Sequence, residues 1–224
     1  MNGVFVTGTD TGIGKTRAST MLLRAYRARG RRAIGMKPVA SGCRETVQGL
    51  RNDDADALIA ASDPPPSYAL CNPFALPLPI APHLAAREAG IEIVLAPIEK
   101  AYRQLATLAD RIVVEGIGGW SVPLSGTLMQ ADLVRALDIP VVLVVGLRLG
   151  CLNHALLTAR AIALDGCAFA GWIANRIDPS MAHADANLDT LRTRIAAPLL
   201  GVIEHAAEHD RDHGETLALT AERL

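Results

Sequence analysis

One stretch near the start of the chain limits the possible fold more than any other. Residues 4–6 form an apolar, β-branched run, residues 8–14 form a turn with three glycines, and Lys15 and Thr16 follow. The apolar run is typical of a buried strand, and the residues after Thr16 have the apolar spacing of an amphipathic helix. Strand, glycine-rich turn, Lys-Thr and helix are arranged as in a phosphate-binding loop, or P-loop. The sequence therefore predicts a nucleotide phosphate site near the N-terminus.

Each part of this loop suits phosphate. Glycines let the backbone curl and point its N–H groups inward, and a helix that begins near Gly14 adds its positive N-terminal end. Lys15 can neutralise the β- and γ-phosphates, and the Thr16 hydroxyl can hold Mg²⁺. The strict pattern has a glycine at position 9, but this chain has Thr9 there and its glycine one residue earlier. A glycine-rich turn that binds nothing is the alternative, and the coincidence of strand, Gly-Lys-Thr and helix favours the phosphate site.

The composition narrows the class of protein. The chain has 224 residues, the usual size of one domain, so we expect a single domain over residues 1–224 with a sizeable core. A net charge of -1 gives no indication of a nucleic-acid or anionic membrane partner. The four cysteines lack C-x-x-C spacing, no apolar run approaches a membrane span, and the first strand leaves no room for a targeting signal. We therefore expect a cytoplasmic protein with reduced thiols.

Strands and helices alternate along most of the chain. Apolar runs predict further strands at residues 33–36, 111–115, 140–146, 169–175 and 199–203. Helical spacing and caps predict helices at residues 15–29, 53–61, 83–89, 97–109, 130–137, 150–164 and 185–195. We expect residues 43–52 to form a mobile polar loop, and the proline-rich residues 63–82 a long irregular connection. The alternation predicts an α/β fold, a doubly wound, mostly parallel sheet with helices on both faces.

Polar side chains stand where the predicted strands end. Lys37 follows the second strand, Glu115 closes the third, and Asn175 closes the fifth. Because the carboxyl ends of parallel strands meet at one rim, where α/β proteins bind ligands, we expect these residues beside the P-loop. A buried carboxylate such as Glu115 is costly unless it is paired or binds a metal. In P-loop proteins an acid at this position contacts Mg²⁺.

Several of these polar residues also have simpler interpretations. Lys37 taken alone would be a solvated lysine at a strand end, and Asp54 could serve only to cap a helix. His205, His209 and His213 are spaced four apart and could bind a metal if this segment were helical. The dense charges around the three histidines favour a solvated chain end instead. The convergence of strand ends on one rim favours a functional role for Lys37 and Asp54.

Five motifs together resemble those of the dethiobiotin synthetase family. They are Gly8-Thr9-Asp10-Thr11-Gly12-Ile13-Gly14-Lys15-Thr16, Lys37-Pro38-Val39-Ala40-Ser41-Gly42, Glu115-Gly116-Ile117-Gly118-Gly119-Trp120, Gly150-Cys151-Leu152-Asn153-His154 and Ala197-Pro198-Leu199-Leu200-Gly201. The resemblance extends from residue 3 to about residue 205, and the displaced glycine belongs to the family's own variant of the loop. It implies an ATP-dependent ligase of biotin biosynthesis, a cyclo-ligase that closes a urea ring.

The resemblance also implies a reaction and its partners. In the family, carbon dioxide and 7,8-diaminononanoate form a carbamate, ATP phosphorylates the carbamate, and the second amine attacks the resulting anhydride. The products are dethiobiotin, ADP and phosphate. Mg²⁺ is the implied cofactor and ATP the co-substrate. The implied assembly is a homodimer with its active sites at the subunit interface.

Functional residues of the family carry over onto matching positions. The resemblance makes Lys15 and Lys37 the catalytic lysines, which stabilise charge on the carbamate and on the transferring phosphate. The implied Mg²⁺ ligands are Thr16, Asp54 and Glu115. The implied ATP contacts are Gly12, Ile13, Gly14, Lys15, Thr16, Arg17, Asp54, Glu115, Gly116, Ile117, Gly118, Asn175, Arg176, Glu204, His205 and Ala206. The implied substrate contacts are Thr11, Ser41, Gly118, Gly150, Cys151, Leu152 and Asn153, of which the segment 150–153 acts across the dimer interface.

The chain departs from the family pattern at two positions. The family usually has alanine where this chain has Ile117, whose side chain either reshapes the pocket or turns outward. It often has proline where Glu204 stands, next to the adenine.

A second class of protein competes with the synthetase. P-loop switch ATPases of the partitioning and septum-positioning type share this topology. They carry a second lysine five residues before the invariant one, where this chain has Asp10. That difference favours the synthetase.

Overall fold

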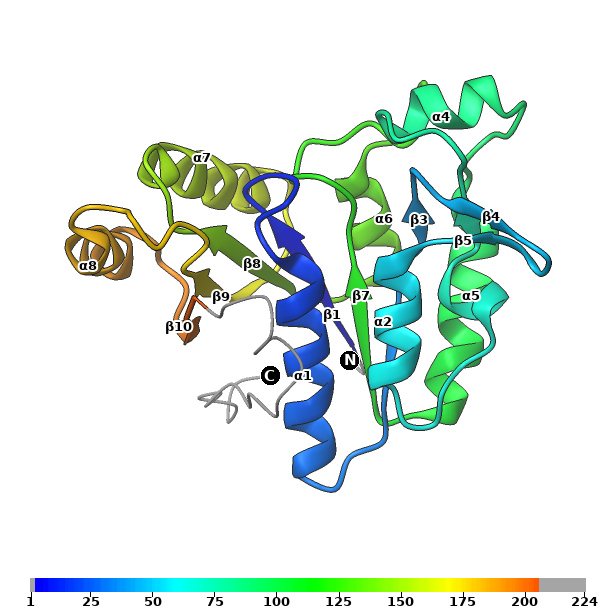
Figure 1. The fold of residues 1–224 in the computed structure, drawn as a ribbon, viewed down its shortest axis with the longest axis horizontal. Coiled ribbons are helices and arrows are strands. Elements are labelled where there is room, and N and C mark those ends of the chain that lie inside the picture. The colour runs from blue at the N-terminus through cyan, green and yellow to red at the C-terminus, as the bar shows by residue number, and fades with distance from the viewer. Residues whose placement is uncertain (1–2, 206–224) are drawn as a thin grey trace.

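A computed structural model of the protein describes residues 3–205, and its framework is one six-stranded sheet (Figure 1). Its strands in chain order are β1 (Gly3–Gly8), β2 (Ala33–Met36), β7 (Arg111–Glu115), β8 (Val141–Gly146), β9 (Phe169–Asn175) and β10 (Leu199–Ile203). They lie side by side in the order β10-β9-β8-β1-β7-β2, and every neighbouring pair is parallel. The α/β prediction is therefore confirmed.

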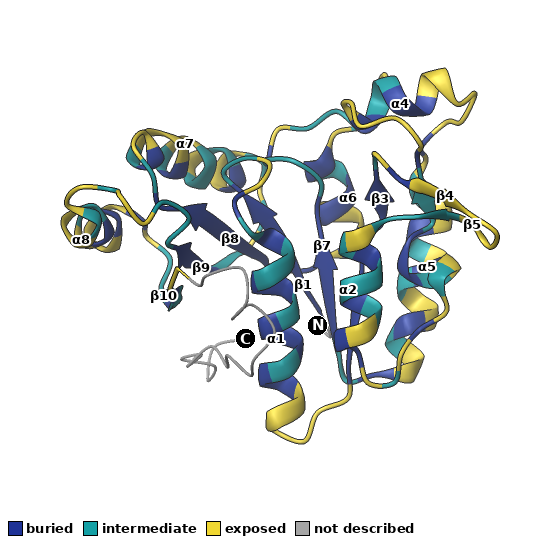
Figure 2. Ribbon diagram, in the orientation of Figure 1, coloured by how far each residue is buried: buried dark blue, intermediate teal, exposed yellow. Residues whose placement is uncertain are grey.

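Helices cover both faces of the sheet, because successive residues of a strand point to opposite sides. On β1, Val4 and Val6 pack toward one face and Phe5 toward the other. The first face is covered by α1 (Lys15–Ala28), α2 (Asp53–Ala61) and α3 (Tyr68–Cys71). The second is covered by α4 (Pro82–Glu88), α5 (Leu95–Leu108), α6 (Gln130–Leu137), α7 (Cys151–Leu164) and α8 (Ala184–Arg194). Figure 2 shows the central strands buried between these layers.

The register of the strands brings the predicted site residues to one rim. Val6 on β1 is opposite Glu115 on β7, and Gly146 on β8 is opposite Asn175 on β9. The loop that follows β1, the acid that ends β7 and the amide that ends β9 therefore lie at the same end of the sheet.

One expected loop is a β-hairpin. Within residues 43–52, β4 (Arg44–Thr46) and β5 (Gly49–Arg51) pair in antiparallel fashion. Arg44 holds the hairpin against α2 through hydrogen bonds to Asp53 and to Asp56. The prediction of a loop was wrong because both strands are largely exposed and polar, so they lack the apolar alternation that marks a strand.

The proline-rich connection also contains regular structure. It includes α3 and β6 (Phe74–Ala75), which pairs in parallel with β3 (Val39–Ala40). These elements are only four and two residues long, with Pro73 between them, so they are too short to show a helical or strand pattern. Across residues 3–205, every helix is too short or too polar to span a bilayer.

Candidate active site

The turn between β1 and α1 has the geometry that phosphate binding requires. Gly12 and Gly14 have φ angles of 74° and 88°, in the left-handed region that favours glycine. A Cβ atom on Gly14 would lie 2.2 Å from Nδ2 of Asn175, which donates a hydrogen bond to the carbonyl of Ile13 at 2.8 Å. Glycine is therefore required where the loop passes β9. Gly14 is also the N-cap of α1, so the helix begins at this turn and directs its free N–H groups toward a ligand.

Four side chains from different elements converge beside the loop. Nζ of Lys37, after β2, lies 2.6 Å from Oε1 of Glu115 and 2.8 Å from Oδ2 of Asp54. The Thr16 hydroxyl lies 2.8 Å from Oδ1 of Asp54 and 2.9 Å from Oε1 of Glu115. The side chains of Lys37 and Glu115 are 3% and 0% exposed, and that of Asp54 is 42% exposed. We call these four residues the cation cluster.

Lys37 and Asp54 stabilise each other's charged forms in the folded protein. Burial lowers the pKa of Lys37, but the carboxylates of Glu115 and Asp54 more than offset burial and raise this pKa above its ordinary value. Burial likewise raises the pKa of Asp54, and Lys37 more than offsets it, so the pKa of Asp54 is lowered. The result is an ammonium group held between two carboxylates.

Lys15 has a different environment. Its Nζ donates to the carbonyl oxygen of Asp10 at 2.9 Å. Burial, followed by the positive charge of Lys37, lowers the pKa of Lys15 to about 8. The Asp10 carboxylate is bonded at 2.6 Å to Arg148, which precedes α7. The pair of Asp10 and Arg148 therefore connects the P-loop to the start of α7.

The cation cluster fits a hard divalent ion. Three of its members, Thr16, Asp54 and Glu115, offer hydroxyl and carboxylate oxygens, the ligands that Mg²⁺ prefers. Oε2 of Glu115 is buried and has no hydrogen-bond partner among residues 3–205, so it is an acceptor that a cation could satisfy.

The histidine-based metal site has no support in the part of the chain that the structure describes. That part contains no group of three or more His, Cys, Asp or Glu side chains placed to hold a metal ion. Nδ1 of His205 lies 3.2 Å from the carbonyl oxygen of Arg176. His209 and His213 lie outside the described residues, as does Ala206.

Two cavities meet at the P-loop, and Gly12, Gly14 and Thr16 line both. The larger, of about 850 Å³, contains the cation cluster. Of the residues expected to bind substrate or phosphate, it is lined by Thr11, Lys15, Ser41, Ile117 and Gly118. Its remaining wall is mainly apolar and includes residues 79–82 and 122–123, which sequence reasoning did not identify.

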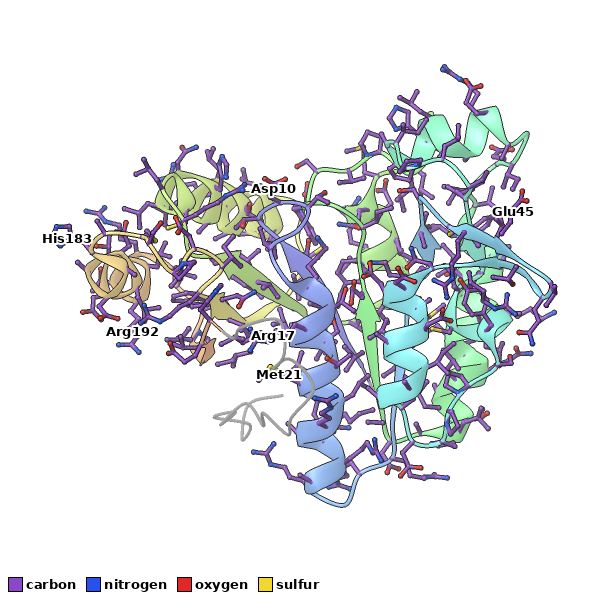
Figure 3. The ribbon with its side chains drawn as sticks, viewed as in Figure 1. Asp10, Arg17, Met21, Glu45, His183 and Arg192 are labelled. Carbon is purple, nitrogen blue, oxygen red and sulfur yellow. The ribbon has the colours of Figure 1, made fainter. Side chains whose placement is uncertain are left out.

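The smaller cavity, of about 550 Å³, follows α1 away from the loop. It is lined by Arg17, Asn175, Arg176 and His205, all expected ATP contacts, and by Met21, Arg24 and Arg27, which were not expected. Figure 3 labels Arg17 and Met21 along α1. Glu204, the departure from the family pattern, lies beside this group, and its Oε2 is 3.1 Å from Nε of Arg176.

The segment 150–153, expected to act across a dimer interface, is at the rim but lines neither of these two cavities. Gly150 is the N-cap of α7, with a φ angle of 94°, and Cys151 is buried while Asn153 is exposed. The hydrogen bond between Arg148 and Asp10 holds the start of α7 beside the P-loop.

Gln130 is a further residue beside the larger cavity that sequence reasoning did not identify. The Gln130 side chain at the start of α6 accepts from the N–H of Ile117 at 2.8 Å and donates to the carbonyl of Gly119 at 2.7 Å. It is 1% exposed, and it holds both ends of the glycine-rich loop that lines the larger cavity. The only signal for this role in the sequence is that Gln130 is a polar residue at the start of a predicted helix.

A phosphate-binding turn next to an acid at the end of the neighbouring strand places this protein among the P-loop nucleotide-binding proteins. Solved structures agree on the fold. A ParA family ATPase from Chlorobium tepidum is 12% identical with a TM-score of 0.56, covering 94% of this chain and 87% of that chain. The MinC:MinD cell division complex of Aquifex aeolicus is 14% identical with a TM-score of 0.56, covering 96% and 87%.

Sequence comparisons define the family. A family model described as an AAA domain matches residues 2–212. The ATP-dependent dethiobiotin synthetase BioD of Xanthomonas euvesicatoria is 64% identical over 199 residues, which cover 89% of both chains. The protein of the same name from Xylella fastidiosa is 58% identical over 205 residues, covering 92% of this chain and 91% of that one. The chain belongs to the ATP-dependent dethiobiotin synthetase family and is an ATP-dependent ligase, as its motifs predicted. The switch ATPases share its fold alone.

Proposed function

We propose that this protein closes the urea ring of dethiobiotin from 7,8-diaminononanoate and carbon dioxide, with cleavage of ATP to ADP and phosphate. The observation that carries the proposal is the junction of two cavities at the P-loop, with Lys37 and two carboxylates on the substrate side. Membership of the synthetase family supports the same reaction.

The two lysines would offset repulsion between two negatively charged reactants. A carbamate is a weak nucleophile and is repelled by the phosphates of ATP. Lys15 and Lys37 both line the larger cavity, so their ammonium groups could hold the carbamate close to in line with the γ-phosphate. The carbamate oxygen attacks phosphorus and ADP leaves. The second amine then attacks the carbamoyl carbon, and phosphate and a proton are released.

A divalent ion would be held by Thr16, Asp54 and Glu115. Mg²⁺ bound there would supply positive charge to the β- and γ-phosphates. The hydroxyl of Thr16 supports this assignment, as does Oε2 of Glu115, which has no hydrogen-bond partner within residues 3–205. On the nucleotide side, Asn175 and Arg176 would contact the adenine, and both line the smaller cavity.

The proposed assembly is a homodimer that shares its sites. Leu149, next to Gly150, is 95% exposed, so its side chain is accessible to a second copy of the chain. The segment 150–153 would reach the substrate of the partner, and two-fold pairs are the commonest assemblies.

The test of the reaction is to mix the protein, Mg-ATP and labelled bicarbonate, with and without 7,8-diaminononanoate. We expect phosphate and a labelled cyclic urea to appear together, and only when the diamine is present. Phosphate released at the same rate without the diamine, or AMP as the nucleotide product, would refute the proposal.

A further inference from the structure

Tyr68 on α3 and Asn72, the C-cap of that helix, connect the two segments that supply Lys37 and Asp54. Asn72, which is 3% exposed, donates from Nδ2 to the backbone carbonyl of Lys37 at 2.7 Å. Its Oδ1 accepts from the hydroxyl of Tyr68 at 3.0 Å. That hydroxyl in turn accepts from the backbone N–H of Asn52 at 2.8 Å. The backbone beside β2 is thereby joined to the residue that begins α2.

The connection continues through Asn52 to the cation cluster. Oδ1 of Asn52 caps α2 by accepting from the backbone N–H of Asp54 at 3.1 Å. Burial raises the pKa of Tyr68 to about 12, so its hydroxyl keeps the proton that it donates to Asn72. The guanidinium of Arg51 lies 4.0 Å from the centroid of the tyrosine ring and restrains it from the hairpin side.

We propose that Tyr68 and Asn72 are positioning residues that set the separation of the Lys37 ammonium and the Asp54 carboxylate. They touch neither cavity-facing group directly and act through the backbone at Lys37 and Asn52. This inference rests on the proposed metal role of Asp54. If Asp54 binds a cation, its position relative to Lys37 determines how well its carboxylate fits that ion, and Tyr68 helps to set that position through Asn52.

The test is Tyr68→Phe, which removes one oxygen atom and keeps the ring. ADP binding is measured by calorimetry, first with EDTA and then across a range of Mg²⁺ concentrations. We expect unchanged affinity in EDTA, which shows that the fold and the P-loop are intact. We expect the half-saturating Mg²⁺ concentration to rise about threefold, less than the roughly tenfold change that loss of a direct partner of a metal ligand commonly causes, because Tyr68 acts through Asn52.

Tyr26→Phe is the matched control. Tyr26 is buried, whereas Tyr68 is half-buried, and the Tyr26 hydroxyl has no hydrogen-bond partner within the described part of the chain, so both measurements should match the wild type. Asn72→Asp is a second variant: it keeps the acceptor for Tyr68 and loses the donor to Lys37. We expect it to lower kcat at least tenfold while KM for ATP changes less than threefold.

The outcomes separate the inference from the proposed function. Tyr68→Phe with the Mg²⁺ dependence of the wild type would overturn the positioning role while leaving the metal site intact. A wild-type protein whose ADP binding does not respond to Mg²⁺ would refute the metal role of Asp54, and the inference with it.

Discussion

Lys37→Gln should separate the structural role of this lysine from its role in turnover. The side chains of Lys37 and Glu115 are almost fully buried and lie 2.6 Å apart. Removing one partner of a buried pair costs about 3–5 kcal/mol, because the other charge stays buried without compensation. The side chain of Asp54 is 42% exposed, so water screens its charge and losing Lys37 as a partner costs Asp54 little. For a chain of this size each kcal/mol lowers Tm by about 2–4 °C, so we expect a decrease of roughly 10 °C.

Turnover should fall further than stability alone explains. Removing a charge that meets developing negative charge typically costs about a hundredfold or more in rate. The assays are thermal unfolding and ATP-dependent ring closure, with and without Mg-ADP. Mg-ADP should raise Tm more in the variant than in the wild type, because the metal would neutralise Glu115. Lys100→Gln, at an exposed position on α5, is the control and should change neither value. Activity within a few-fold of the wild type, or an unchanged Tm, would refute the reasoning.

Three further predictions concern the loop, the dimer and pH. Gln130→Met should raise KM for the diamine about tenfold by releasing the loop at 116–119, whereas Gln104→Met on the exposed side of α5 should have no effect. Leu149→Glu should give a monomer in sedimentation at micromolar concentration. Leu164→Glu, at the other end of α7 and 87% exposed, should remain dimeric, and a dimeric Leu149→Glu would exclude this interface. The pKa of Lys15 is about 8, and the phosphates of bound ATP should raise it, so ATP binding at pH 8 should take up roughly half a proton. Calorimetry in buffers of different ionisation heat would measure this uptake, and proton release on binding would contradict the prediction.

The six strands of the main sheet could be predicted because each is a buried apolar run between turn signals. The P-loop and Glu115 could be predicted because their chemistry depends on residues adjacent in sequence or at the end of a strand. The hairpin at 44–51 could not, because its exposed polar strands have no apolar face. Nor could Tyr68, Asn72 or Gln130, because each acts through hydrogen bonds to backbone groups of a distant segment, and such bonds leave no periodic pattern.

Ile117 shows how the same backbone bonds let the chain depart from its family pattern. Ile117 lines the larger cavity and also packs against the core. Neither expected alternative, a side chain that reshapes the pocket or one that turns outward, describes this position completely. The N–H of Ile117 is held by Gln130, and a Cβ atom on the neighbouring Gly116 would lie only 2.7 Å from the same amide oxygen. The path of the loop is therefore fixed by Gln130 and by the glycine beside it. A larger side chain at 117 can change the cavity wall while the loop keeps its position.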